Sequence, residues 1–213
     1  MTSMSALPTV GIVIPAYNEE DSIAKCLDAC IDQTSPADEI IVVDNKSDDT
    51  TVKIVKLYQK KYPDAHIRLL YETDAQGIVP ARDCGFNAAT TDVVGRIDAD
   101  SIVDETWVAA VRHIFKHKHV AAATGPVLYH DMPLQKAGFR VDEKIRSTLH
   151  RLAKDHRFLF GSNMAIRASA WHEIKELVNK DKADELHEDI DLALTMFENN
   201  LEIVYDPNMI AGM

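Results

Sequence analysis

The feature that most constrains the fold is a regular alternation of short β-branched runs with segments of helical period. Strand-like runs occur at 10–15, 39–44, 67–71, 93–98 and 120–126. Between them, apolar residues recur every three to four positions, as on the buried face of a helix. This alternation predicts an α/β fold, a mostly parallel sheet with helices on both faces. In such folds ligands bind at the carboxyl ends of the strands.

The rhythm changes after residue 126. The elements predicted beyond it are a long helix over 133–154, a turn at Gly161, a strand over 163–167, two further helices and a strand over 202–205. We see no linker and no repeat, so we expect a single domain over 1–213, with halves of about 8–126 and 127–213. The last eight residues, 206–213, show no clear element, which favours a chain truncated at its C-terminus.

Composition narrows the partners and the compartment. Lysine and arginine total 23 against 34 acidic residues, a net charge of −11, which disfavours general binding of nucleic acid phosphates. Three cysteines are too few for a disulfide framework and fit a reducing compartment, so we expect a cytoplasmic protein. Met1 to Pro8 lack the features of a signal peptide, and no stretch approaches the ~20 apolar residues that span a bilayer.

Acidic residues stand at or just beyond two of the predicted strand ends. Asp44 ends the second strand, and Asp98 and Asp100 follow the fourth. One residue apart on an extended stretch, Asp98 and Asp100 can point to the same side. Mg²⁺ or Mn²⁺ is usually held by one or two carboxylates together with substrate phosphates. The D-x-D therefore predicts a metal and diphosphate site, and the alternative is a pair that solvates a turn or caps a helix.

A second acidic group, Glu188, Asp189 and Asp191, opens a predicted helix. We expect Ile190, Leu194 and Phe197 to form the inward face of this helix. Carboxylates in a first turn are also ordinary partners of the helix dipole, and that interpretation accounts for at least one of the three. A zinc-protease H-E-x-x-H is excluded, because Asp191 stands where the second histidine would be.

Taken together, six stretches resemble the family 2 glycosyltransferases, inverting enzymes with the GT-A fold. They occur in the family's order and cover nearly the whole chain. The matching stretches are Ile14-Pro-Ala-Tyr-Asn-Glu-Glu20, Val42-Val-Asp-Asn-Lys-Ser-Asp-Asp-Thr50, Gly77-Ile-Val-Pro-Ala-Arg-Asp-Cys-Gly85, Ile97-Asp-Ala-Asp100, Gly161-Ser-Asn163 and His187-Glu-Asp189.

The resemblance implies a nucleotide-sugar donor bound by the first half of the chain. Pro15, Ala16, Tyr17 and Glu19 would line the nucleotide site, and Asp44 would bond the base or the ribose. An aromatic face and fixed carboxylates suit a uracil nucleoside, so uridine diphosphate is the expected carrier. The second half would then face the acceptor, a hydroxyl of a glycan, of a lipid-linked molecule or of a small molecule. A role in cell-envelope polysaccharide or glycolipid synthesis is implied.

The resemblance also implies the reacting groups. Asp98 and Asp100 would match the ribose and metal ligands, with Mn²⁺ or Mg²⁺ as cofactor, and Arg82 would approach the pyrophosphate, a good partner for a guanidinium. Asp189 would match the general base that takes the acceptor's proton. Glu188, its neighbour, is the candidate if the register is shifted by one residue. A single displacement would invert the anomeric carbon.

The sequence departs from the family pattern at two positions. Asp83 stands where the family often has Asn, and Ser101 where a further acidic residue often follows the D-x-D. The Q-x-x-R-W signature of the processive synthases is absent, so the resemblance implies transfer of single sugars.

Two other functions remain open. A sugar nucleotidyltransferase would need a glycine-rich, basic loop after the first strand, where this chain has the acidic run 15–20. A catalytically silent nucleotide-sugar-binding module would bind the donor with Asp189 misplaced or acceptor contacts missing. Donor hydrolysis measured beside donor binding would separate these functions.

The segment Lys144–Arg157 is basic and amphipathic within an acidic protein, with Ile145, Leu149 and Leu152 along one face. The favoured interpretation is a surface helix packed on the core. The alternative is peripheral contact with lipid phosphates at the inner face of a membrane, which would hint at the acceptor.

Overall fold

The computed structural model describes residues 6–128, 158–178 and 187–212. The elements within these ranges, in chain order, are β1 Val10–Ala16, α1 Ile23–Ile31, β2 Glu39–Asp44, α2 Thr51–Lys61, the short 3₁₀ helix η1 Pro63–Ala65, β3 Ile67–Tyr71, α3 Ile78–Ala88, β4 Val93–Ile97, β5 Ile102–Val103, α4 Trp107–Ile114, β6 Val120–Thr124, β7 Val127–Leu128, β8 Asn163–Arg167, α6 Ala168–Ile174, α7 Glu188–Glu198, β9 Glu202–Tyr205 and β10 Ala211–Gly212.

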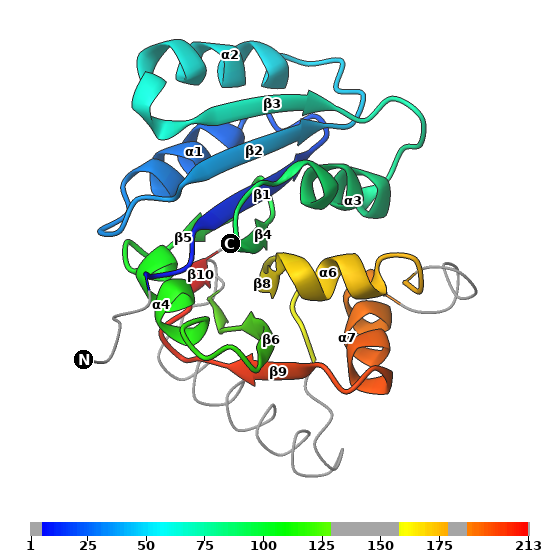
Figure 1. Cartoon of the computed structure of the whole chain (residues 1–213). Coiled ribbons are helices and arrows are strands. Elements are labelled where there is room, and N and C mark those ends of the chain that lie inside the picture. Colours follow the sequence, from blue (N-terminus) through cyan, green and yellow to red (C-terminus); the bar gives the residue numbers. More distant parts are fainter. Residues whose placement is uncertain (1–5, 129–157, 179–186, 213) are drawn as a thin grey trace.

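The main sheet has seven strands in the order β3-β2-β1-β4-β8-β6-β9. The four strands from β3 to β4 run parallel to one another, and β6 runs parallel to β9 (Figure 1). Only β8 is antiparallel to its neighbours β4 and β6. The predicted α/β fold with a mostly parallel sheet is therefore confirmed, and β8 is its one reversed strand.

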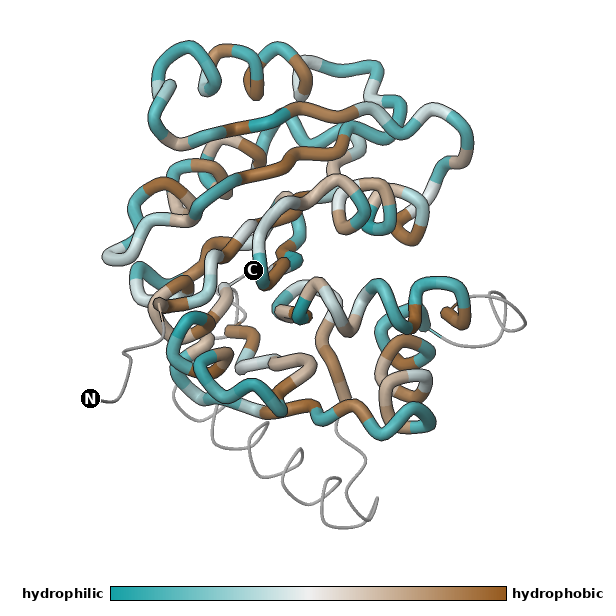
Figure 2. The backbone as a smooth tube through the Cα atoms, viewed as in Figure 1, coloured by the Kyte–Doolittle hydropathy of each residue, from teal (hydrophilic) through white to brown (hydrophobic). Residues whose placement is uncertain are grey.

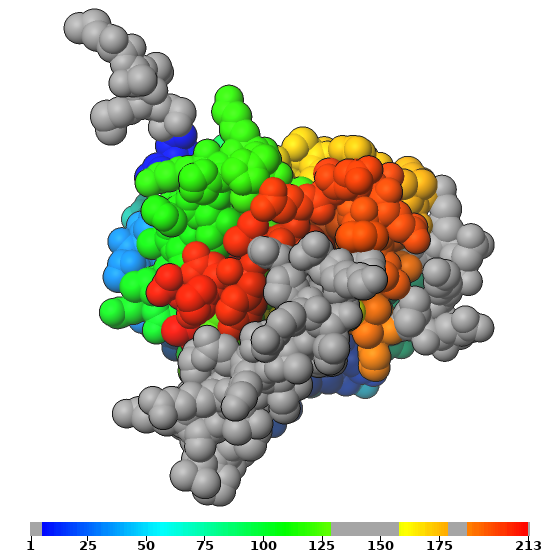
Figure 3. All heavy atoms as spheres, turned by 90° about the horizontal axis from the view of Figure 1, so that it is seen from below, coloured from blue at the N-terminus to red at the C-terminus, as the bar shows by residue number. Residues whose placement is uncertain are grey.

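A second, small sheet was not expected from the sequence. In it β10 pairs antiparallel with β5 and parallel with β7. The expectation that residues 206–213 contain no element was wrong, because Ala211 and Gly212 form β10 in this sheet. Figure 3 shows the C-terminal segment in red against the green segment that carries β5 and β7.

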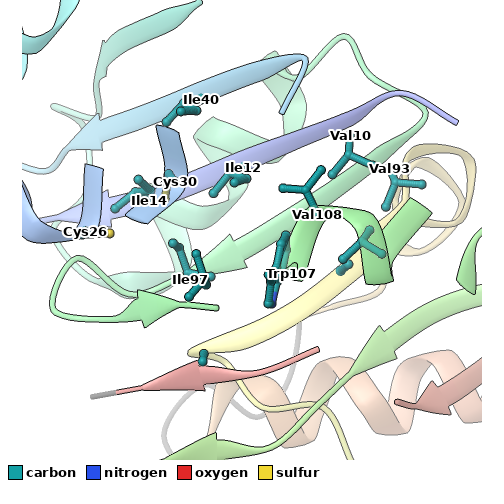
Figure 4. Packing of buried hydrophobic residues seen from close by; sticks show 14 of the residues in the cluster. Val10, Ile12, Ile14, Cys26, Cys30, Ile40, Val93, Ile97, Trp107 and Val108 are labelled. Carbon is teal, nitrogen blue, oxygen red and sulfur yellow. The ribbon is translucent and has the colours of Figure 1, made fainter. Parts of the chain in front are cut away.

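Helices cover both faces of the main sheet, and each face has its own core. Strands β1 and β2 send alternate side chains to α1, α2 and α4 on one face and to α3, α6 and α7 on the other. Figure 2 shows the apolar strands between more polar outer helix faces, and Figure 4 shows Ile12 and Ile14 packed near Cys26 and Trp107. This packing fixes the strand ends that carry the site.

Two local expectations were wrong and one cannot be compared. In α7 the buried residues are Leu192, Ala193, Thr195 and Met196, whereas Phe197 is 46% exposed. The buried face of α7 is therefore rotated about the helix axis from the expected one. Neighbouring elements, and not hydrophobicity alone, decide which side of a helix is buried. The strand predicted over 120–126 ends at residue 124.

The long helix predicted over 133–154 and the basic segment Lys144–Arg157 lie outside the described residues. Among the helices that the structure does describe, none is long and apolar enough to cross a bilayer.

Candidate functional site

The candidate site lies along the edge of the sheet where the parallel strands end. Strand β1 lies between β2 and β4, with Ala16 in register with Asp44. Tyr17 follows β1, Asp44 ends β2 and Asp98 follows β4. The topology thus brings to one edge three residues that are far apart in the sequence.

Two loops of this edge are joined by hydrogen bonds. The loop after β1 and the loop after β2 exchange bonds between Asn18 N–H and Ser47 Oγ (3.0 Å) and between Asp48 N–H and Asn18 Oδ1 (2.9 Å). Thr51 Oγ1 accepts from Glu19 N–H at 2.8 Å. These bonds fix the segment that carries Tyr17 and Glu19 relative to the end of β2.

The predicted nucleotide residues differ in exposure. Pro15 and Ala16 are buried within β1, Tyr17 is 49% exposed, and the Glu19 carboxylate accepts a 2.5 Å bond from Ser22 Oγ. Asp44 is buried, yet no donor among the described residues reaches its Oδ1. Buried polar atoms are almost always hydrogen-bonded, so an acceptor without a donor at a ligand-binding edge fits a ligand that supplies one.

Asn45 organises the neighbouring loop. Its Nδ2 donates to the carbonyl oxygens of Glu72 (3.0 Å) and Ala75 (2.8 Å), and its Oδ1 accepts from Gly77 N–H at 2.7 Å. The sequence analysis gave Asn45 no role. The role of Asn45 becomes visible only in the conformation of residues 72–77. The one sequence signal for this role was the position of Asn45 directly after a strand.

The D-x-D lies on a turn. The expectation of an extended stretch was wrong, because Ser101 N–H donates to the Asp98 carbonyl oxygen at 3.0 Å and closes the turn. Asp98 accepts a 2.8 Å bond from Arg96 Nη2, and Asp100 is exposed. Partial burial, followed by the nearby charge of Asp98, raises the pKa of Asp100.

These two carboxylates fit a divalent cation. A hard cation bound with substrate phosphates needs one or two carboxylates, and its charge would relieve the repulsion between Asp98 and Asp100. The described residues contain no group of three or more potential ligands, so phosphates and water would have to complete the coordination.

A cluster of buried charges connects the D-x-D to α7. The guanidiniums of Arg82 in α3 and Arg96 in β4 are 0% and 3% exposed. Glu188, at the start of α7, accepts from Arg82 Nη1 at 2.6 Å through one oxygen and pairs with Arg96 Nη1 through the other. Arg82 also lies 2.8 Å from Asp83. Arg82 Nη2 is also buried without a hydrogen-bond acceptor among the described residues, so the guanidinium keeps a donor for a further anion.

Burial and neighbouring charge act in opposite directions on the pKa values of this cluster. Burial lowers the pKa of Arg96, but the charges of Asp98 and Glu188 outweigh that effect and raise it. Burial raises the pKa of Asp83, and the positive charge of Arg82 opposes the rise.

Asp189, the predicted base, follows Glu188 in the first turn of α7. Its Oδ2 accepts a 3.3 Å bond from Gly161 N–H, and its Oδ1 accepts from Ile190 N–H at 2.9 Å. Gly161 is closely surrounded, since a Cβ there would lie 2.9 Å from both Arg96 Nη1 and Glu188 Oε1. One turn therefore touches the predicted base and the charge cluster.

Asn163 fixes the strand that follows this turn. It is fully buried, accepts from Trp107 Nε1 at 2.8 Å, and donates to the carbonyl oxygens of Pro126 (2.9 Å) and Met209 (2.7 Å). These bonds occupy its side-chain amide, so its role in the described structure is to join β8 to the small sheet.

Arg96, like Asn45, was not predicted as a site residue from the sequence. Arg96 stands in the apolar run 93–97, and a charged residue inside a buried strand requires a partner. That signal could have identified Arg96, although the sequence offers no way to choose Glu188 as its partner.

The sequence is 35% identical to the glycosyltransferase AglE of Haloferax volcanii over 106 residues, which make up 49% of this chain and 34% of that protein. The structure resembles the mannosyltransferase PcManGT from Pyrobaculum calidifontis in complex with GDP-Man and Mn²⁺, with a TM-score of 0.75, 21% identity, and coverage of 98% of this chain and 57% of that one.

It also resembles glucosyl-3-phosphoglycerate synthase from Mycobacterium tuberculosis in complex with Mn²⁺, uridine diphosphate and phosphoglyceric acid. The TM-score is 0.62 at 21% identity, over 95% of this chain and 69% of that one. At such identities the likeness establishes the fold, and it confirms the expected GT-A architecture. The chain spans about a third of AglE and 57% of PcManGT.

The profile of Glycosyl transferase family 2 matches residues 11–174, most of the chain. The match runs from β1 to the end of α6 and includes Asp44, Arg82 and the D-x-D. This chain therefore belongs to glycosyl transferase family 2.

Proposed function

We propose that this chain transfers a glycosyl group from a nucleotide-diphosphate sugar to an acceptor hydroxyl by a single inverting displacement. The observation that carries the proposal is that Arg96 pairs with both Asp98 and Glu188. This joins the D-x-D, suited to a diphosphate, to the turn of α7 that holds Asp189. A transferase needs both functions at one site, a group for the leaving diphosphate and a base for the incoming hydroxyl.

In the proposed reaction the bond between the anomeric carbon and the phosphate oxygen breaks, and the diphosphate leaves with the electron pair. The acceptor oxygen forms the new bond on the opposite face of the sugar, and its proton goes to the Asp189 carboxylate. One displacement inverts the configuration and requires no covalent intermediate on the protein. The absence of the Q-x-x-R-W signature supports transfer of single sugars rather than polymer extension.

Asp98 and Asp100 would hold Mn²⁺ or Mg²⁺, which when bound neutralises negative charge on the leaving diphosphate. Two features support a cation there: both carboxylates lie on one turn, and a cation would relieve the repulsion between their charges. The two similar solved structures contain Mn²⁺, as their descriptions state.

The donor would lie against the loop after β1, with Pro15 and Ala16 as the rigid base and Tyr17 and Glu19 beside the nucleoside. The unpartnered Asp44 Oδ1 suits a donor such as the N3–H of uracil or a ribose hydroxyl. Uridine diphosphate is therefore the proposed carrier. PcManGT is described with a guanosine carrier and the mycobacterial enzyme with uridine diphosphate, so both carriers belong in the test.

The acceptor is proposed as a hydroxyl of a glycan, a lipid-linked molecule or a small molecule, approached from the α7 side. Cytoplasmic location and peripheral membrane contact stay predictions, the latter because Lys144–Arg157 lies outside the described residues.

The test measures nucleotide binding and sugar transfer with Mn²⁺ and with excess chelator, over a panel of uridine and guanosine diphosphate sugars. Asp100→Asn should weaken the metal-dependent part of binding, because it removes a charge and preserves shape. Asp64→Asn is the matched control, since Asp64 is exposed in η1 before β3, away from the carboxyl ends of the strands. Equal affinity with Mn²⁺ and with chelator would contradict the metal site.

The same experiment separates the other two functions. A silent binding module would bind the nucleotide sugar without transferring or hydrolysing it. A sugar nucleotidyltransferase would instead release pyrophosphate from a nucleoside triphosphate and a sugar 1-phosphate, which a parallel assay detects.

A further inference from the structure

Glu188 lies between two buried cations that come from different elements. One oxygen accepts from Arg82 of α3 and the other pairs with Arg96 of β4, while the Glu188 side chain is itself only 16% exposed. Because a guanidinium stays protonated, both cations remain charged in the interior. Among the carboxylates that the structure describes, only that of Glu188 forms ion pairs with both guanidiniums.

Such an arrangement is weak evidence for stability. Removing charges from water is costly, and a buried ion pair often contributes little beyond well-packed apolar residues. Arg96 Nε is buried without a hydrogen-bond acceptor among the described residues, which adds to that cost. The best-attested use of a buried ionic group is to specify one arrangement of the elements that carry it. Here the arrangement places the first turn of α7 against α3 and β4.

The residue whose position is specified in this way is Asp189. It directly follows Glu188, and its Oδ2 accepts from Gly161 N–H at 3.3 Å. Gly161 touches the ion pair itself, because any Cβ there would lie 2.9 Å from Arg96 Nη1 and from Glu188 Oε1. The Asp189 carboxylate and the ion pair are therefore held by the same backbone turn.

We infer that Glu188 is a positioning residue, which anchors the first turn of α7 to Arg82 and Arg96 so that Asp189 faces the acceptor hydroxyl. This inference rests on the proposed function, in which Asp189 is the base. It assigns to Arg82 Nη1 the role of holding Glu188. Both Glu188 oxygens are already engaged by buried guanidiniums, which leaves the role of base to Asp189.

The decisive variant is Glu188→Gln, which keeps volume and removes the charge. Turnover should fall by about 10²-fold, a loss that a displacement of a reacting group by about 1 Å can cause, while donor affinity stays near that of the wild type. Glu198→Gln is the matched control, since Glu198 is exposed at the other end of α7. It should leave turnover unchanged.

A double variant distinguishes positioning from general support of the fold. If Glu188 acts through Asp189, adding Glu188→Gln to Asp189→Asn should lower turnover no further. If the two losses multiply, or if Glu188→Gln lowers donor affinity as much as turnover, the inference is overturned. Normal turnover of Asp189→Asn alone would instead refute the proposed function's base, so the two failures are distinguishable.

A readout independent of activity is hydrogen exchange of the Gly161 amide. In Glu188→Gln this amide should exchange faster than in the wild type, because the displaced Asp189 carboxylate no longer accepts its hydrogen bond. Wild-type protection in Glu188→Gln would overturn the inference. If that variant does not fold, Gly161→Ala replaces it in the turnover assay, since its methyl group would push the ion pair apart without changing any charge. Unchanged turnover in Gly161→Ala would then overturn the inference.

Discussion

Replacing Asp44 with Asn should change stability and nucleotide binding in opposite directions. Asp44 is 5% exposed at the end of β2, and its Oδ1 has no donor among the described residues. In the free protein this buried acceptor has no hydrogen bond from any residue that the structure describes. In the proposed complex a nucleoside N–H or O–H would supply the missing donor.

The magnitudes follow from the two states. An unsatisfied buried polar group costs about 1–3 kcal/mol, and more when it is charged. Asn has nearly the same volume and no charge, so the free energy of unfolding of the free protein should rise by about 1 kcal/mol. For a chain of this size that corresponds to a rise in Tm of about 2–4 °C. The loss of a hydrogen bond to a charged group, about 1.5–3 kcal/mol, should weaken nucleotide binding by about 10- to 100-fold.

Thermal unfolding followed by circular dichroism, without ligand, measures the first effect, and calorimetric titration with uridine diphosphate and Mn²⁺ measures the second. Asp64→Asn is again the control and should alter neither quantity. An Asp44→Asn protein that is less stable than the wild type and binds uridine diphosphate equally well would refute the reasoning, because Asp44 would then be a structural residue.

Three further predictions concern other parts of the molecule. Asp189→Asn should lower turnover by about 10²–10⁴-fold with donor affinity preserved, and near-normal turnover would exclude Asp189 as the base. Gly85→Ala should lower the free energy of unfolding in urea by about 1–3 kcal/mol, because the added methyl group would lie 2.3 Å from Val13 Cγ1 and force α3 away from β1. Burial, together with the hydrogen bond donated to Asp28, raises the pKa of Tyr58 from 10.0 to about 12. Protonated Tyr58 therefore contributes fully to the free energy of unfolding below its pKa of 10.0 in the unfolded chain, and this contribution is lost as pH rises through about 12. Tyr58→Phe should accordingly reduce the loss of stability between pH 10 and 12, measured by urea unfolding.

The strands of the main sheet could be predicted from the sequence because each is a short run rich in apolar residues. The predicted bounds of β2, β3, β8 and β9 coincide with those of the structure. The small sheet could not be predicted, since β5, β7 and β10 have two residues each and two residues show no periodicity. Such strands form because tertiary packing brings their backbones together.

The site could be predicted only in its separate parts. The sequence placed Asp44 and the D-x-D at strand ends because strand ends are readable from local pattern. It could not place Glu188 between Arg82 and Arg96, because partners 92 and 106 residues apart are set by topology. The prediction of the buried face of α7 was wrong for a similar reason, since the surrounding helices and strands decide which side of this helix is covered.

The single antiparallel strand of the main sheet explains how distant parts of the chain reach one edge. In β8, Asn163 is in register with Ile97 and Arg167 with Val93, so β8 begins where β4 ends. Gly161 precedes β8 and therefore lies beside Arg96 and the turn of the D-x-D. If β8 ran parallel to β4, its first residues would lie at the opposite edge, and Gly161 could contact neither Arg96 nor Asp189. The reversed direction of β8 thus places the turn at Gly161, which contacts Asp189, at the same edge as the carboxylates of Asp98 and Asp100.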